Sequence, residues 1–210
     1  MIDGNDLALS PEEESGIDKN RQLFVDYLRR ADRQGMEELI TYLTDKTDFF
    51  VCPASTRFHG NYPGGLCEHS LHVLERLTKH MADPLFRERI ANVSMNTAII
   101  TALLHDVCKA NYYTVEFRNR KVNGVWQQVP FFAVADDYPY GHGEKSVDII
   151  RNFIELTEEE KFAIRWHMGY TEPKEVWGSL DAAIEKYPLV LALHEADLEA
   201  SKFLDRTVST

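Results

Sequence analysis

The sequence predicts an all-α fold that carries one β-hairpin insertion. Apolar residues recur at helical spacing along most of the chain, as they do at Leu23, Tyr27 and Leu28. The exception is the segment of about 112–132, where Asn123-Gly124 separates two runs rich in β-branched and aromatic residues. Such a pattern is typical of a hairpin closed by a type I′ turn.

The helices follow in order from apolar spacing and from residues that begin or end a helix. Two are expected between Ile17 and about Asp45, separated at Gly35. Thr157 and Glu160 form a capping box at the start of a later helix. Residues 52–65 are rich in Pro, Gly, Asn and Ser and are expected to be a loop. The further helices are expected at about 66–82, 93–107, 144–156, 158–168, 181–186 and 188–204.

Length and composition suit one domain over residues 18–210, preceded by a flexible acidic tail at 1–17. The chain has 210 residues and no stretch of about 18 apolar residues, so no membrane association is expected. The three cysteines form no CxxC pair, and the acidic N-terminus lacks the pattern of a signal peptide. Both observations favour a cytoplasmic location.

The charge of the chain disfavours nucleic acid as a partner. Its net charge is −11; five acidic and no basic residues lie in residues 1–17, so the remainder carries −6. A body of this charge repels an extended phosphate backbone but can accept a small phosphorylated substrate that metal ions hold.

Two aspartates lie where a carboxylate is costly to bury. Asp106 follows His105 at the end of the apolar run TAIITALLHD, and Asp197 lies within PLVLALHEADLEAS. A divalent cation would neutralise both, because imidazole and carboxylate groups are good ligands for transition metals. His69 lies on the flank of an apolar helical stripe and can point inward. Taken singly, each histidine is better explained as a satisfied, partly buried side chain than as a ligand, and each aspartate could be a helix cap or an ion-pair partner.

The order of these residues resembles a known family. The stretches YPGGLCEHSLHV, ALLHDVCKA, GHGEKSV, IRWHMG and ALHEADLEAS are similar to the His … His-Asp … Asp signature of the HD-domain superfamily of metal-dependent phosphohydrolases. The similarity runs from about Cys52 to Phe203 and is strongest to the HD domain of certain 3′→5′ exoribonucleases. Those enzymes carry a preceding OB-fold, whereas residues 1–50 here are expected to be helical. Cys108 also departs from the Gly or Ala usual at that position.

The resemblance implies an HD-domain helical bundle and two divalent ions, with Mn, Fe, Ni, Co, Mg and Zn all left open. Asp106 would bridge the ions and help to position a metal-activated water. Lys109 follows Asp106 by three residues and would share its face if the helix persists, so it could neutralise the substrate phosphate or be a solvated cation near the helix C-terminus. The implied metal ligands are His69, His105, Asp106 and Asp197 for the first ion, joined by His142 and His167 for the second. A site with one ion stays open as the alternative, and in it His142 and His167 would lie outside the ligand set.

We therefore expect a metal-dependent phosphohydrolase that cleaves a phosphate ester or anhydride, in a small nucleotide, by a metal-activated water. Three alternatives stay open: a diiron oxygenase of the HD type, a 3′→5′ exonuclease, and a non-catalytic nucleotide-binding module. The sequence does not indicate the oligomeric state.

Several neighbouring residues have two possible roles. His59 could face the cleft, and Cys67 and Cys108 are expected to be small buried hydrophobic residues. In the hairpin, Arg118 and Arg120 share a face and could approach a phosphate as part of a lid. The simpler expectation is a solvated arm whose aromatic residues Phe117, Trp126 and Phe131 pack on the body. Tyr112, Tyr113, Tyr138 and Tyr140 could line an entrance or merely pack at the base of the insertion.

Overall fold

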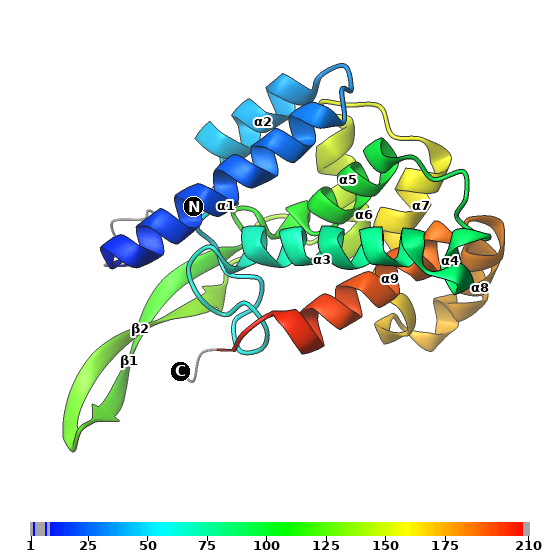
Figure 1. The fold of residues 1–210 in the computed structure, drawn as a ribbon. Coiled ribbons are helices and arrows are strands. Elements are labelled where there is room, and N and C mark those ends of the chain that lie inside the picture. Colours follow the sequence, from blue (N-terminus) through cyan, green and yellow to red (C-terminus); the bar gives the residue numbers. More distant parts are fainter. Residues whose placement is uncertain (1, 3–6, 8, 208–210) are drawn as a thin grey trace.

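A computed structural model describes residues 2, 7 and 9–207 as a helical bundle from which a two-stranded hairpin projects (Figure 1). Within these residues no helix combines the length and apolar composition needed to cross a lipid bilayer. The helices are α1 (Pro11–Arg30), α2 (Met36–Asp45), α3 (Gly65–Ala82), α4 (Pro84–Arg87), α5 (Met95–Leu104), α6 (His142–Arg151), α7 (Glu158–Trp166), α8 (Trp177–Lys186) and α9 (Leu189–Glu199). The strands are β1 (Tyr113–Val122) and β2 (Val125–Val134).

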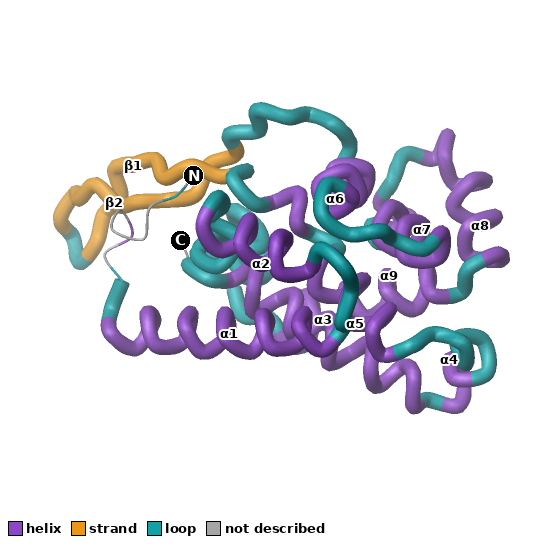
Figure 2. Tube along the Cα trace, turned by 90° about the horizontal axis from the view of Figure 1, so that it is seen from above, coloured by secondary structure: helices purple, strands orange, loops and turns teal. Residues whose placement is uncertain are grey.

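Helix α3 forms the centre of the bundle, with α5 and α9 packed against it and α7 packed against α9 (Figures 1 and 2). Its apolar stripe, which includes Leu66, Val73 and Leu77, is fully buried. Every residue of α5 from Ala98 to Leu104 is buried as well. A helix that is apolar on all sides must be enclosed by others, so the end of α5 delivers the following residues to the interior of the protein.

The predicted acidic tail is wrong from residue 11 onward, because these residues form the first turns of α1. Ser10 accepts a hydrogen bond from the backbone N–H of Glu13, and the Glu13 side chain accepts one from the backbone N–H of Ser10. This capping box, with Pro11 in the first turn, strongly favours the start of a helix at this point. The acidic composition of the segment had indicated a flexible tail instead. The rest of the predicted tail falls largely on residues 1, 3–6 and 8, which lie outside the described part of the chain.

The hairpin has the register that its turn residues predict. Val122 pairs with Val125, and Asn123 and Gly124 between them adopt φ values of 51° and 86°, as a type I′ turn requires. The arm extends away from the helices (Figure 2). Phe117 is 62% exposed and Trp126 is 70% exposed, so the expectation that these rings pack on the body is wrong.

The helix boundaries differ from expectation mainly beside the polar residues. The helix predicted over 93–107 ends at Leu104, after which His105 and Asp106 form a turn that leads into the 3₁₀ turn Val107–Lys109. The helix predicted over 188–204 ends at Glu199 and continues as a π-helical turn, Ala200–Leu204. Both departures occur where buried charged groups must be oriented, which is where local helical spacing is least informative.

Candidate metal centre

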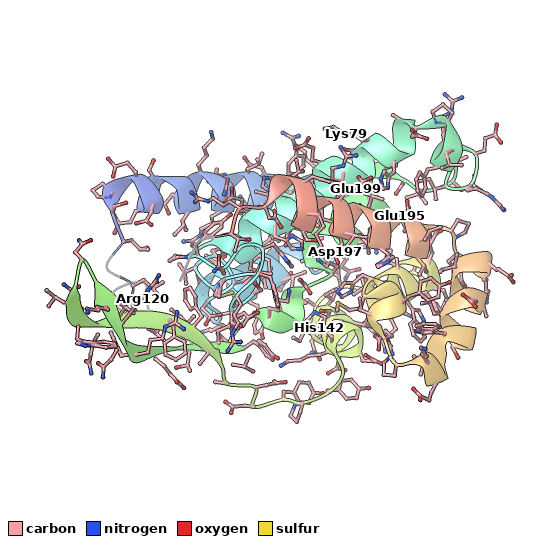
Figure 3. All side chains as sticks on the ribbon, turned by 90° about the horizontal axis from the view of Figure 1, so that it is seen from below. Lys79, Arg120, His142, Glu195, Asp197 and Glu199 are labelled. Carbon is pink, nitrogen blue, oxygen red and sulfur yellow. The ribbon has the colours of Figure 1, made fainter. Side chains whose placement is uncertain are left out.

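The six predicted metal ligands converge in the middle of the bundle from five different elements. In Figure 3, Asp197 on α9 and His142 at the start of α6 lie in the centre of the molecule, and both line one cleft. The other four are His69 on α3, His105 and Asp106 directly after α5, and His167 directly after α7.

Asp106 lies at the centre of this cluster, and each of its carboxylate oxygens faces two imidazoles. Its Oδ1 lies 2.7 Å from Nε2 of His142 and 3.4 Å from Nε2 of His167. Its Oδ2 lies 3.5 Å from Nε2 of His105 and 4.0 Å from Nε2 of His69. A carboxylate with this arrangement can bridge two neighbouring cations.

The histidines are held so that Nε2, and not Nδ1, points into the cluster. Nδ1 of His105 and Nδ1 of His167 donate to the backbone carbonyl three residues earlier, at 2.8 Å and 2.7 Å. Nδ1 of His69 donates to Oδ2 of Asp205 at 2.7 Å. Because carbonyl and carboxylate oxygens accept, Nδ1 carries a hydrogen in all three rings, and in the neutral imidazole Nε2 would present its lone pair to a metal.

Three of these Nε2 atoms, on His69, His105 and His167, are buried and have no hydrogen-bond partner. His69 Nε2 lies 3.2 Å from Oδ1 of Asp197 without hydrogen-bond geometry. Leaving a buried polar atom without a partner costs about 1–3 kcal/mol, so native proteins avoid it. A divalent cation placed among these atoms would satisfy all three and would neutralise the two carboxylates.

Lys109 reaches the centre although the helix that would carry it does not persist. The 3₁₀ turn places its Nζ 2.6 Å from Oδ2 of Asp106. Burial favours the neutral carboxyl of Asp106, but the charges of Lys109 and His142 outweigh burial and hold its pKa well below the ordinary value. Burial likewise opposes the charge of Lys109, and the Asp106 carboxylate outweighs it and raises the Lys109 pKa. Both groups are therefore charged.

Two of the histidines have raised pKa values. Burial opposes the charge of His69, but Asp197 and Asp205 outweigh burial and raise its pKa to about 9. Burial opposes the charge of His142 as well, and the carboxylate of Asp106 outweighs it and raises its pKa to about 9. The carboxylates thus favour protonated imidazoles at these two positions, and metal ions would displace those protons.

Asp205 is a candidate site residue that the sequence did not single out. Its Oδ2 holds His69, as described above, and its Oδ1 accepts from Nδ1 of His72 at 2.6 Å. These two hydrogen bonds outweigh burial and lower the Asp205 pKa to about 2. The π-helical turn after α9 brings it back toward α3. The only sequence signal is a lone acidic residue just beyond the last predicted helix.

A cleft of about 490 Å³ opens above the cluster. His59 lines this cleft, and its ring centroid lies 4.9 Å from that of His69. Burial, together with the charges of His69 and Lys109, lowers the His59 pKa to about 4, so this imidazole is neutral. Tyr112 and Tyr113 also line the cleft.

In the part of the chain that the structure describes, the residues that line the cleft do not include Arg118 or Arg120. They do not include Tyr138 or Tyr140 either. Figure 3 places Arg120 on the projecting hairpin, well apart from His142. The structure therefore gives no support to a lid formed by these arginines. The hairpin contributes only the residues at its base to the cleft wall.

The cysteines are free and buried, as expected for Cys67 and Cys108. Sγ of Cys108 lies 3.4 Å from Nδ1 and 3.6 Å from Nε2 of His142, and its backbone N–H donates to Ser146 Oγ. Asp106, Cys108 and His142 are close enough to one another to share a metal ion. The unusual Cys108 is thus in contact with the centre.

Comparison of the chain with family models, curated proteins and solved structures finds no match. The class of protein must therefore be inferred from the site itself. The described residues form several buried groups of His, Asp and Cys whose ligand atoms lie within 4.8 Å of one another. Such groups could hold one or more metal ions.

Proposed function

We propose that this protein is a metal-dependent hydrolase of the HD-domain type that cleaves a phosphate ester or anhydride in a small nucleotide. The observation that carries the proposal is the set of buried, unpartnered Nε2 atoms of His69, His105 and His167 around Asp106. Hydrogen bonds at Nδ1 fix all three imidazoles in the orientation that a metal ligand needs. The order of the motifs along the chain supports the same family.

The donor set fits two divalent ions of the transition series. Imidazole nitrogens outnumber carboxylates in the cluster, whereas Mg²⁺ in proteins takes oxygen ligands. When bound, a pair of such ions lowers the pKa of a water molecule and neutralises phosphate oxygens. The first ion is assigned to His69, His105, Asp106 and Asp197, and the second to Asp106, His142 and His167.

The chain's own charged groups have distinct roles in this scheme. Asp106 is ionised, so its carboxylate would be a ligand of both ions. Lys109 is a protonated ammonium group within reach of Asp106 and lines the cleft. It acts as a point charge that binds a phosphate oxygen of the substrate.

The cleft favours a small substrate over a polymer. Its volume of about 490 Å³ is in the range of sites that bury one small ligand. In the part of the chain that the structure describes, Lys109 and Lys202 are the only lysine or arginine residues that line it. A nucleic-acid strand would need a longer basic track, which the acidic body does not offer.

The direct test measures metal content and hydrolysis together. Metal-free protein is loaded with Mn²⁺, Co²⁺, Ni²⁺, Fe²⁺, Zn²⁺ or Mg²⁺ and assayed for phosphate release from a panel of nucleotides. Asp106→Asn should lose turnover and bound metal, whereas Asp18→Asn, a change on the exposed surface of α1, should keep both. If iron-loaded protein takes up oxygen and no nucleotide releases phosphate, the hydrolase proposal is wrong and the oxygenase alternative is favoured.

A further inference from the structure

The loop of residues 54–60 forms one wall of the cleft and presents an exposed aromatic ring there. Phe58 lines the cleft and is 72% exposed. Its backbone N–H donates to Ser55 Oγ at 2.8 Å, and the Ser55 hydroxyl donates to the His59 carbonyl at 2.9 Å. The hydroxyl of Tyr113 ties the first carbonyl of the loop to β1 at 3.2 Å. The backbone that carries the ring is thus held in place.

Two further apolar side chains line the same cleft from other elements. Val134, at the end of β2, is 55% exposed, and Leu198, next to Asp197 on α9, is 48% exposed. Single exposed apolar residues are ordinary on a protein surface. Three of them on separate elements around one cleft indicate a ligand with an apolar end, and the proposed metal ions at its floor would take an anionic end.

We propose that Phe58, Val134 and Leu198 form a subsite for the base of a nucleoside monophosphate, with Phe58 as the stacking surface. The inference rests on the proposed function, because it assigns the phosphate to the metal centre. Purine and pyrimidine rings all stack on aromatic side chains, whichever polar groups the base carries. The held loop limits the entropy lost on stacking.

The cleft also suits a single phosphate group. Besides the proposed ions, its cationic side chains in the described part of the chain are Lys109, assigned above to a phosphate oxygen, and Lys202. Beside an acidic body, this charge matches one phosphate.

Two ligands that differ only in the base provide the test: adenosine 5′-monophosphate and ribose 5-phosphate. Binding is measured by calorimetry and phosphate release by steady-state kinetics, with metal-loaded wild type, Phe58→Ala and Phe58→Trp. Phe117→Ala is the matched control, because Phe117 is exposed to a similar degree and lies outside the cleft. The melting temperature of each variant verifies folding.

We expect Phe58→Ala to weaken binding of adenosine 5′-monophosphate about tenfold and to raise its KM similarly with little change in kcat. The same variant should leave ribose 5-phosphate unaffected, and Phe58→Trp should keep wild-type affinity for the nucleotide. Equal affinity of the wild type for the two ligands, or an equal loss for both in Phe58→Ala, overturns the subsite. Base-dependent binding that Phe58→Ala removes, without hydrolysis of either ligand under any metal, upholds the subsite and overturns the proposed hydrolase.

Discussion

The Nε2 atoms of His105 and His167 would each destabilise the metal-free protein by about 1–3 kcal/mol, because they are buried without a hydrogen-bond partner. A ligand that binds only the folded chain stabilises it in proportion to the logarithm of its concentration over Kd, by about 4 kcal/mol at a thousandfold excess. Mn²⁺ or Co²⁺ should therefore raise the melting temperature by roughly 10 °C in wild type. Differential scanning calorimetry should show no such rise in Asp106→Asn and the full rise in Asp18→Asn.

The number of ions depends on two further histidines. His142 and His167 both face Oδ1 of Asp106. Replacing both by Ala should reduce the bound metal to about one ion per chain. It should also remove most of the hydrolysis rate, since two-metal chemistry needs both positions. Metal analysis at saturating Mn²⁺ is the measurement. Two ions per chain in the double variant would assign these histidines to orienting roles outside the metal's ligand set.

Asp205 acts on the metal through His69. Its carboxylate fixes the imidazole by the Nδ1 hydrogen bond, and partners of this kind change metal affinity about 10- to 100-fold. Asp205→Ala should weaken binding of the first ion by that factor while leaving the fold intact. Asp205→Asn, which keeps an acceptor oxygen, should restore part of the affinity. Unchanged metal affinity in Asp205→Ala would make the contact merely structural.

Proton release gives a pH signature of the same site. His69 and His142 have pKa values of about 9 without metal, above the ordinary value of 6.5, so both are protonated at pH 7. Each must lose a proton to bind a metal, so binding should release about two protons at pH 7 and fewer as the pH approaches 9. Calorimetry in buffers of different ionisation enthalpy measures this number. The raised pKa values also stabilise the metal-free fold below pH 6.5, and this stability is lost as the pH rises through 9.

At the scale of elements, the sequence was most informative where apolar spacing is regular. The hairpin register followed from Asn123-Gly124, and the start of α7 followed from its capping box. Prediction failed at Ser10, where a cap was hidden by acidic composition, and beyond Glu199, where a π-helical turn replaced the expected α-helix. Such turns depend on tertiary contacts that spacing alone does not encode.

The candidate site shows the same division between local and tertiary information. His69 and the pair His105-Asp106 stand out because polar groups interrupt apolar stripes. Asp205 does not, because its importance arises from contact with α3 across 136 residues of sequence. Hydrogen bonds at Nδ1 and the bare Nε2 atoms also become evident only once the backbone is placed.

The hairpin can be shortened to test its independence from the site. Replacing residues 117–130 by Asn-Gly joins Glu116 to its partner Phe131 at the same kind of strand pair that the native turn closes. Because the removed part lies outside the cleft lining, metal content and hydrolysis of small nucleotides should stay within about twofold of wild type. A large loss of activity with normal metal content would show that the arm does act on the substrate, as the lid hypothesis holds.

At the scale of the whole molecule, net charge decides between a small nucleotide and a nucleic-acid strand. The chain carries −11 overall, and the cleft offers Lys109 and Lys202 as its lysine or arginine residues in the described part of the chain. Arg118, Arg120 and Lys121 lie on the separate hairpin arm. A strand bound along this surface would meet mostly repulsion, whereas one phosphate at the metal centre would not.

Turnover of mononucleotides and dinucleotides should therefore exceed that of a single-stranded oligonucleotide at matched metal and salt. Few counterions are released when one or two phosphates bind, so affinity for a mononucleotide should fall only slightly between about 50 and 200 mM salt, whereas a protein that contacts 6–10 phosphates loses about 10³–10⁵. The measurement is the initial rate on each substrate across that salt range. Faster degradation of the oligonucleotide, with a steep salt dependence, would show that the hairpin cations guide a strand to the metals and would favour the exonuclease alternative.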